Sequence, residues 1–444
     1  MHKERFIEEI VRGSRGLIGS TIRVCGWVHR IRDIGGVKFV VLRDRTGFIQ
    51  AVAKRGEAPE SVLEVFSGLR EESVVCVEGV LREAPTREGC EIAVSSARIL
   101  STPIEPLPLD VRTSRRAGLA TRLRYRWLDA RNPEVQSIFI LKAWVASKFR
   151  EYFAKHGFVE VFTPKIVAAG TEGGANVFPV IYFGRTVYLA QSPQLYKQMA
   201  VLAGFERVFE IGPVYRAEPH NTTRHLNEYH SLDIEVGFIE SHEDVMKYVE
   251  GFFVELSKSM AEDERVARIL EMHGVEPPRA PPGGFPRIRM REAYEILERE
   301  YGKRVPYGED LDSEAEKLIG EYARERYGSD FVFVTEYPWR VRPFYAMRKE
   351  DEPDWTLSFD LIMRGVEVAT GGQREHRYER LLENIKDKGL NPEDFQFYLD
   401  FFKHGAPPHG GAGIGLERIV MQTLGLQNIR EARLLPRDLE RLTP

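Results

Sequence analysis

The sequence predicts an α+β protein with a small N-terminal β-barrel followed by a larger mixed domain. Residues 1–105 contain short β-prone segments separated by glycine and polar turns. Residues 133–156 repeat apolar side chains at helical spacing. Two further β-prone runs, residues 208–215 and 232–238, flank a charged loop, as in an antiparallel pair. The chain of 444 residues is long enough for two or three domains.

The N-terminal part is expected to form its barrel from about five strands. One helix is expected there, over residues 58–69, between the third and fourth strands. This pattern suits a small closed barrel such as an OB-fold, and it also fits any other small β-barrel without a ligand. The predicted strands are residues 21–29, 38–43, 48–53, 73–81 and 91–100.

Residues 106–132 have the composition of a basic hinge. Three prolines, Pro103, Pro106 and Pro108, introduce it, and arginines follow with few acids among them. A hinge of this kind suits contact with RNA phosphates, and it suits a solvated connector equally well. The arginines are Arg112, Arg115, Arg116, Arg122, Arg124, Arg126 and Arg131.

The charged loop between the two later strands holds two arginines, Arg216 and Arg224. Arginine is always charged, and its planar set of donors fits phosphate or carboxylate oxygens bidentately. A solvated hairpin tip is the simpler explanation of a charged turn. Here apolar strands flank Arg216, and a half-buried charge without a partner is costly. A polyphosphate ligand therefore explains the loop better.

The loop resembles motif 2 of the class II aminoacyl-tRNA synthetases. Its pattern, RAE at residues 216–218 and NTTRHLNE at residues 221–228, is similar to the version in aspartyl-tRNA synthetases. The resemblance implies an ATP- and Mg²⁺-dependent ligase that activates L-aspartate and transfers it to the 3′ end of tRNA(Asp), with tRNA(Asn) left open. It also implies an OB-fold joined to a catalytic domain whose antiparallel sheet is flanked by helices.

Two more segments resemble the other motifs of this class, in the expected order. The helix over residues 133–156 and the strand before Pro164 resemble motif 1 (about 150–164), which implies a homodimer in which Pro164 is structural. The run HGGAGIGLER at residues 409–418 resembles motif 3 (about 407–425); it lacks the spacing and βαβ context of a dinucleotide loop. The expected domains are an anticodon-binding OB-fold at 1–105, a hinge at 106–132 and a catalytic domain at 133–444.

Within the barrel, residues 35–52 resemble the anticodon-binding OB-fold of the aspartyl, asparaginyl and lysyl enzymes. The resemblance implies that Phe39 stacks on an anticodon base and that Gln50 and Glu78 read base edges. Without it, Phe39 would be explained as barrel core. It also implies that His29 lies near the third anticodon base and favours tRNA(Asp) over tRNA(Asn), unless His29 is only an exposed strand residue.

The resemblance implies an ATP site with three catalytic residues, Arg216, Glu367 and Arg418. Two anions must meet when a carboxylate attacks the α-phosphorus of ATP, so catalysis is mainly charge neutralisation and positioning. Glu367 and Thr370 are expected to hold Mg²⁺, with Asp360 near them. The residues expected to bind ATP are Arg216, Ala217, Glu218, Arg224, His225, Leu226, Tyr229, Glu367, Gly415, Leu416, Glu417 and Arg418.

The same resemblance implies an aspartate pocket in which Lys197 and Arg374 supply positive charge to the β-carboxylate. Similar asparaginyl enzymes lack the lysine, so Lys197 is expected to select aspartate over asparagine. Arg374 ends an alternating run, residues 366–375, which alone suggests only a charged strand end. Glu172, in the glycine-containing loop 171–174, is expected to meet the α-ammonium. The other residues expected there are Gln194, Leu195, Tyr196, Arg216, Asp233 and Thr370.

Composition limits what else the chain does. Its net charge is −4, so contacts with RNA must come from local patches. Three cysteines, Cys25, Cys76 and Cys90, are too few and too scattered to predict a disulfide framework or a zinc site. Neither a signal peptide nor a membrane-spanning run is expected, which favours a reducing cytoplasm. Residues 260–330 are expected to be an insertion between motifs 2 and 3, without an assigned function.

Three alternatives stay open at this point. An asparaginyl-tRNA synthetase would share the fold, and a paralogue that makes asparagine would lack the barrel. A catalytically silent RNA-binding protein would be expected to have lost some of Arg216, Glu367 and Arg418, and the sequence has all three.

Overall fold

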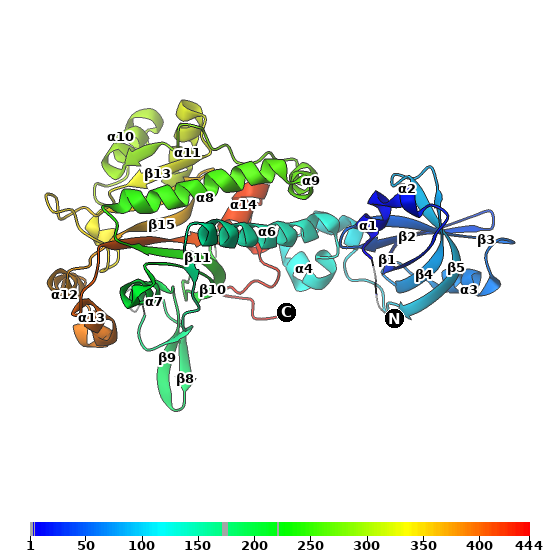
Figure 1. The fold of residues 1–444 in the computed structure, drawn as a ribbon, viewed down its shortest axis with the longest axis horizontal. Helices are drawn as coiled ribbons and strands as arrows, with labels where there is room; N and C mark the ends of the chain where they lie inside the picture. The colour runs from blue at the N-terminus through cyan, green and yellow to red at the C-terminus, as the bar shows by residue number, and fades with distance from the viewer. Residues whose placement is uncertain (1–2, 4, 171–175, 220–221) are drawn as a thin grey trace. The chain divides into compact units, whose positions relative to one another are not determined.

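The structure is a computed structural model that describes residues 3, 5–170, 176–219 and 222–444. It divides into two compact units, Met1–Gln136 and Ser137–Pro444 (Figure 1). The predicted hinge at 106–132 therefore belongs to the first unit. Among the described residues, no helix has the length and apolar character needed to cross a membrane.

The described part of the first unit contains the predicted closed barrel, with strand order β1-β2-β3-β5-β4. Alternate side chains point inward, and Val24, Val28, Val40 and Leu42 are fully buried. Two short helices that the sequence analysis did not predict, α1 (Ile7–Arg12) and α2 (Ser14–Leu17), precede it. The other elements are β1 (Thr21–Ile34), β2 (Val37–Asp44), β3 (Gly47–Lys54), α3 (Glu60–Gly68), β4 (Val74–Glu83) and β5 (Cys90–Ser101).

The expectation drawn from the cysteine spacing is wrong, because Cys25 and Cys76 form a disulfide. They lie opposite each other on neighbouring antiparallel strands, β1 and β4, with Cα atoms 4.0 Å apart. A separation of 51 residues in sequence hides this pairing, which depends on strand register. Cys90, the third cysteine, is buried.

The hinge region is more ordered than a linker. It forms η1 (Val111–Arg116), α4 (Leu119–Arg124) and α5 (Arg126–Asp129). Arg122 and Arg126 are buried and bind the buried Asp129 at 3.2 and 2.5 Å. These two arginines therefore fit neither of the predicted alternatives, because they are neither solvated nor open to phosphate.

The second unit is built on a sheet whose described strands run in the order β12-β13-β14-β15-β16-β11-β10-β6 (Figure 1). The inner pairs are antiparallel, as predicted, and the outermost pairs, β12 with β13 and β10 with β6, are parallel. The strands are β6 (Val159–Glu160), β10 (Arg207–Tyr215), β11 (Glu228–Gly237), β12 (Arg287–Arg289), β13 (Phe331–Thr335), β14 (Ser358–Met363), β15 (Val366–Arg374) and β16 (His409–Gly415).

Helices α6 (Pro133–Lys155) and α8 (His242–Glu262) run along this sheet (Figure 1). Their apolar faces, with Phe149, Phe153 and Phe252 buried, join the main core of the unit. The remaining helices are α7 (Gln194–Ala200), η2 (Val201–Phe205), α9 (Glu264–His273), α10 (Met290–Tyr301), α11 (Ser313–Tyr327), η3 (Trp339–Val341), α12 (Tyr378–Asp387), η4 (Pro392–Phe395), α13 (Gln396–Phe402), α14 (Leu416–Leu424) and η5 (Ile429–Ala432). A small separate sheet has the order β7 (Ile166–Val167), β9 (Arg185–Leu189) and β8 (Pro179–Tyr182).

One β-prone run of the second unit is only partly a strand. The run over residues 331–344 is a strand only as far as Thr335. Glu336 then takes a left-handed conformation, with φ of 58°, and Pro338 has no amide hydrogen to donate to a sheet. The segment between motifs 2 and 3 contains helices α10 and α11.

Candidate active site

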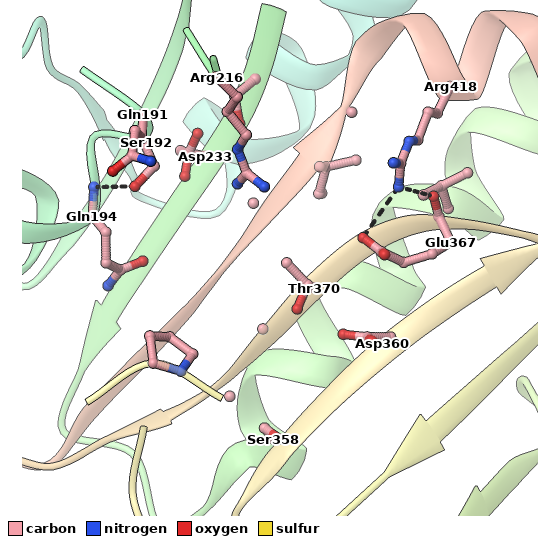
Figure 2. A pocket seen from close by; sticks show the side chains of 18 of the residues that line it. Gln191, Ser192, Gln194, Arg216, Asp233, Ser358, Asp360, Glu367, Thr370 and Arg418 are labelled. Atoms are coloured by element: carbon pink, nitrogen blue, oxygen red, sulfur yellow. Dashed lines mark hydrogen bonds and ion pairs between the residues drawn. The ribbon is translucent and has the colours of Figure 1, made fainter. Parts of the chain in front are cut away.

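A cavity of about 370 Å³ opens over the sheet of the second unit (Figure 2). Strands β11, β14, β15 and β16 contribute to its lining, together with the loop between β10 and β11. The structure brings most of the predicted ligand-binding residues together here. Those that line the cavity are Gln194, Arg216, Glu218, Arg224, His225, Leu226, Tyr229, Asp233, Glu367, Thr370, Arg374, Gly415, Glu417 and Arg418.

Arg216 begins the loop between β10 and β11, and Asn227 fixes the loop's backbone. The backbone amide of Arg216 donates to the carbonyl of Asn227 (2.9 Å). Asn227 Nδ2 in turn donates to the carbonyls of Arg216 (2.7 Å) and Glu218 (3.2 Å). The guanidinium of Arg216 lies 5.9 Å from the ring of Tyr229 and points into the cavity (Figure 2). These bonds join the start of the loop, where Arg216 lies, to its end at Asn227.

Glycines in β15 and β16 form the floor of the cavity for two different reasons. A Cβ on Gly371 or Gly372 would come within 2.7 Å of main-chain oxygen atoms on neighbouring strands, so sheet packing requires glycine there. A Cβ on Gly413 or Gly415 would meet nothing closer than 3.4 Å. Side chains would fit at those two positions, so glycine there keeps the floor bare for a flat ligand.

Glu367, Asp360 and Thr370 lie on β14 and β15 at one end of the cavity (Figure 2). Arg418 Nη1 donates to the main-chain oxygen of Glu367 (2.8 Å) and lies 3.3 Å from its carboxylate. Burial raises the pKa of Asp360, and with the charge of Glu367 adding to it the pKa reaches about 6, against an opposing effect of Arg342. Burial would also raise the pKa of Glu367, but Arg418 and other arginines hold it below its usual value.

These residues fit a magnesium ion bound together with phosphates. In the described chain, no group of three His, Cys, Asp or Glu side chains is placed to hold a metal alone. Mg²⁺ needs only one or two carboxylates when substrate phosphates supply the other oxygens. Asp360 Oδ1 is buried and accepts no hydrogen bond from any described residue, although Arg342 Nη2 lies 2.8 Å from it as an ion pair. That oxygen, and the repulsion between Asp360 and Glu367, suit a divalent cation.

Three charged residues of this end were missed by the sequence analysis. Arg342 is almost fully buried, and besides its ion pair with Asp360 it donates from Nη1 to Thr370 Oγ1 (3.0 Å). Asp310 lines the cavity, and burial raises its pKa. Glu316, on α11, accepts from Arg224 Nη1 (2.8 Å). No local pattern marks these positions, since their partners are distant in sequence.

At the other end of the cavity, two buried cations and two buried carboxylates form a cluster of alternating charge. Lys197 Nζ donates to Asp233 Oδ1 (2.8 Å) and lies 3.4 Å from Glu235 Oε2. Arg374 Nε donates to Glu235 Oε1 (3.0 Å), and its Nη2 donates to Gln194 Oε1 (3.2 Å). Burial opposes ionisation of Glu235, but Arg374 and Lys197 outweigh it and its pKa is lowered.

The lysine lies deeper than the prediction placed it. Lys197 is 2 % exposed, does not line the described cavity, and donates a further bond to the carbonyl of Ala412 (3.1 Å). Its partner Asp233 lines the cavity, as Arg374 does. Lys197 therefore acts on the cavity through Asp233.

A second layer of buried polar groups supports Gln194. Its Nε2 donates to Gln198 Oε1 (3.0 Å), and the hydroxyl of Tyr398 donates to the same oxygen (3.1 Å). Gln198 Nε2 donates to His409 Nε2 (2.8 Å), which leaves His409 Nδ1 as the donor to the carbonyl of Pro407 (2.8 Å). Burial lowers the pKa of His409, in agreement with a neutral ring. The glutamine side chain that meets Arg374 is therefore fixed.

Several predicted binding residues have structural roles instead. Leu195 belongs to an apolar core cluster, and Tyr196 stacks on Phe397. Leu416 is also core, and Ala217 donates its backbone amide to the carbonyl of Asn176 (2.8 Å). None of the four lines the cavity in the part of the chain that the structure describes. A motif marks a whole segment, while only one face of a helix in that segment points toward a ligand.

Glu417 lines the cavity, but its carboxylate mainly makes structural contacts. Its carboxylate accepts from Lys142 Nζ (2.5 Å), Arg433 Nη1 (3.1 Å) and the backbone amide of His230 (3.0 Å). Burial would raise its pKa, yet the hydrogen bonds and charges of these neighbours lower it to about 2. Glu172, predicted to meet the α-ammonium, lies outside the described residues.

In the first unit, a groove on the outer face of the barrel brings His29, Phe39 and Gln50 together. Gln50 Nε2 donates to Glu91 Oε2 (2.7 Å), and Glu91 also lines the groove. Glu78 instead binds Arg23 (2.6 Å), away from the lining that the structure describes. Glu78 therefore lies apart from Gln50, because register places Glu91 opposite Gln50.

The groove is also basic. Burial and the charge of Arg43 lower the pKa of His29, and Arg43 Nη1 lies 3.3 Å from its Nδ1. Phe39 is only half-buried on this outer face and is not core. The cationic side chains of the lining are Arg30, Arg32, Lys54, Arg82 and Arg87. Aromatic, amide and cationic groups on an open face suit single-stranded nucleic acid.

The cavity holds arginines and carboxylates over a bare glycine floor, which suits a nucleotide such as ATP. The barrel has a groove that suits single-stranded nucleic acid. Together these features indicate an ATP-using enzyme that acts on RNA. Two family models match the chain. The model for tRNA synthetases class II (D, K and N) matches residues 118–439, and that for the OB-fold nucleic acid binding domain matches residues 22–100. The chain belongs to the class II tRNA synthetases of this D, K and N group, and it is an ATP-dependent aminoacyl-tRNA ligase.

Curated relatives and solved structures agree with this. An Aspartate--tRNA(Asp/Asn) ligase from Aeropyrum pernix is 67% identical over 444 residues, covering 100% of both chains. An Aspartate--tRNA(Asp) ligase from Pyrococcus abyssi is 47% identical, covering 96% of this chain and 97% of its own. An asparaginyl-tRNA synthetase from Pyrococcus horikoshii superposes with a TM-score of 0.90 at 32% identity, covering 100% of both chains. An aspartyl tRNA synthetase from Entamoeba histolytica gives 0.87 at 31%, covering 100% and 93%.

Proposed function

We propose that the protein activates L-aspartate with ATP and then transfers the aspartyl group to the 3′ end of tRNA(Asp). The observation that carries the proposal is the cluster of Lys197, Asp233, Glu235 and Arg374 at the inner end of a cavity whose outer end holds Glu367 and Arg418. Its cations suit a side-chain carboxylate, and Asp233 suits an ammonium group. The relatives at 67% and 47% identity, both named aspartate ligases, support aspartate over asparagine.

In the first step, an oxygen of the aspartate α-carboxylate attacks the α-phosphorus of ATP, and pyrophosphate leaves. Arg216 stands between the two ends of the cavity, where it neutralises the meeting anions. Arg418 and Tyr229 flank the bare glycine floor, which suits the adenine. In the second step, a ribose hydroxyl at the tRNA 3′ end attacks the activated carbonyl and AMP leaves; among the described side chains we assign no base for it.

Mg²⁺ belongs to the proposal as well. Glu367 and Asp360, with Thr370, are the residues that would hold it, because all three carry oxygens at the outer end of the cavity. The ion would shield the charge of the leaving pyrophosphate. In the protein itself, Arg418 and Arg342 keep this carboxylate pair partly neutralised.

The test is pyrophosphate–ATP exchange with each of the twenty amino acids in turn. Aspartate alone is expected to support exchange. Exchange with asparagine and not aspartate would make the protein an asparaginyl enzyme, and no exchange with any amino acid would support the silent RNA-binding alternative.

Charging of tRNA(Asn) as well is a second candidate function. It is favoured by the Aeropyrum pernix relative, which is 67% identical and named for both tRNAs, whereas the sequence-based expectation for His29 favours tRNA(Asp) alone. His29 lies in the anticodon groove, 4.8 Å from the ring of Phe48. Charging assays with both tRNAs decide between these outcomes, and His29→Trp should change the ratio of the two rates without changing aspartate activation. An unchanged ratio would make His29 a scaffold residue only.

A homodimer and a cytoplasmic location complete the proposal. The motif 1 region exposes apolar side chains that a partner copy would cover, with Phe162 81% and Ile166 50% exposed. Sedimentation velocity at micromolar concentration should give twice the mass of the chain. A monomer at that concentration would contradict the dimer. The cytoplasm is where tRNA is charged for protein synthesis, and fractionation of cells tests that location.

A further inference from the structure

Helix α11 lies in the segment between motifs 2 and 3 that sequence patterns left without a role, and it packs closely on the active-site sheet. Gly320 of α11 faces Gly365 in the turn between β14 and β15, where a Cβ on Gly320 would lie 2.5 Å from the backbone nitrogen of Gly365. Only glycine allows this approach. The helix is thus fixed against the turn that leads directly into Val366 and Glu367.

One helical turn before Gly320, on the same face of α11, Glu316 reaches the active site. It is 6% exposed. Its Oε2 accepts two hydrogen bonds, from Arg224 Nη1 (2.8 Å) and from the backbone amide of Glu367 (3.0 Å). One carboxylate therefore joins the motif 2 arginine to the strand that carries the proposed metal ligand.

We infer that Glu316 is a positioning residue for nucleotide binding, which holds Arg224 and the backbone of Glu367 in the geometry that receives the outer phosphates of ATP. The inference rests on the proposed function and gives the segment between the motifs a part in it. Arg224 lines the cavity, and its Nε is buried with no hydrogen-bond partner among the described residues. Donors of this guanidinium therefore remain for a phosphate while Glu316 holds Nη1.

The test compares Glu316→Ala and Glu316→Gln in aspartate-dependent pyrophosphate exchange, with ATP and aspartate varied separately. Loss of a charged hydrogen bond that orients Arg224 should raise the KM for ATP about tenfold or more. The KM for aspartate should stay within about twofold, because the aspartate end of the cavity does not touch Glu316. Glu316→Gln keeps an acceptor oxygen and should recover part of the loss. Glu321→Ala, an exposed position on the same helix, is the matched control and should change neither constant.

A double-mutant cycle with Arg224→Ala separates positioning from simple destabilisation. If Glu316 acts through Arg224, adding Glu316→Ala to Arg224→Ala should raise the KM for ATP clearly less than Glu316→Ala does alone, and the remaining rise would reflect its bond to the Glu367 amide. Fully additive effects, equal rises in both KM values, or a wild-type KM for ATP in Glu316→Ala would each overturn the inference. If Glu316→Ala does not fold, the same cycle with Glu316→Gln decides. Wild-type protein without aspartate-dependent exchange would instead contradict the proposed function.

Discussion

Replacing Lys197 with methionine is expected to destabilise the second unit and to remove most aspartate activation. The four buried charges of this cluster, Lys197, Arg374, Asp233 and Glu235, sum to zero. Methionine has a similar length but leaves two carboxylates facing one guanidinium. Removing one partner of a buried ion pair costs about 3–5 kcal/mol, because the other charge stays buried without compensation.

The effect on activity should be specific to aspartate. A loss of about 3 kcal/mol in binding of the transition state lowers kcat/KM for aspartate more than a hundredfold. Pyrophosphate exchange at varied aspartate and fixed ATP measures this, and the KM for ATP should change little. The matched control is Lys258→Met on α8, where the lysine side chain is 70% exposed. A kcat/KM for aspartate equal to that of wild type would refute the reasoning and weaken the aspartyl assignment.

A second substitution separates stability from binding. Adding Glu235→Gln to Lys197→Met brings the formal charge of the cluster back to zero. Thermal unfolding should therefore recover part of the lost stability, as a favourable coupling energy between two contacting sites. Aspartate activation should not recover, because the cation that orients Asp233 is still absent. Additive losses of stability would show that charge balance is not what Lys197 supplies.

Three further predictions concern other parts of the chain. The Glu367→Gln protein should unfold at the wild-type temperature but should not form the adenylate. Pyrophosphate exchange near the wild-type rate, without a response to added Mg²⁺, would exclude a metal-binding role for Glu367. Cys25→Ser, or reduction of the disulfide, should destabilise the barrel by about 4 kcal/mol for a loop of this length, and hydrogen exchange in β1 and β4 that matches wild type would contradict this. The pKa of Glu417, lowered from 4.5 to about 2, contributes stability that is complete above pH 4.5 and is lost as pH falls toward 2. Glu417→Gln should remove this acid-dependent part of the stability, measured as the free energy of unfolding against pH. An unaltered pH dependence would rule out Glu417 as its origin.

The sequence predicted the order of the elements and the residues that carry charge into the site. Arg216, Glu367 and Arg418 come from three separate segments, and the structure places all three on one cavity (Figure 2). Each segment has a distinctive local pattern: a charged loop between strands, an alternating run ending in glycines, and glycines leading into a helix. Such patterns can be recognised in the sequence because each lies within one or two neighbouring elements and does not depend on contacts with distant ones.

Contacts across elements were not predictable in the same way. The disulfide between Cys25 and Cys76, and the bond from Gln50 to Glu91, depend on the register of strands that are distant in sequence. Glu316 and Arg342 have no local pattern at all, and their importance comes from the partners that the sheet brings to them. The depth of Lys197 was missed for the same reason, since a motif does not reveal which neighbour stands in front of a side chain.

The position of β16 has a consequence for synthesis of the chain. This strand lies near the C-terminus, yet in the sheet it pairs with β15 on one side and β11 on the other. Until residue 415 of the nascent chain has emerged, β11 and β15 each lack this neighbour, so each has an unpaired edge. The nucleotide site cannot assemble in such a chain, because Gly413, Gly415 and Arg418 are still missing. Emergence of residues 409–418 is therefore expected to complete the sheet and the nucleotide site together.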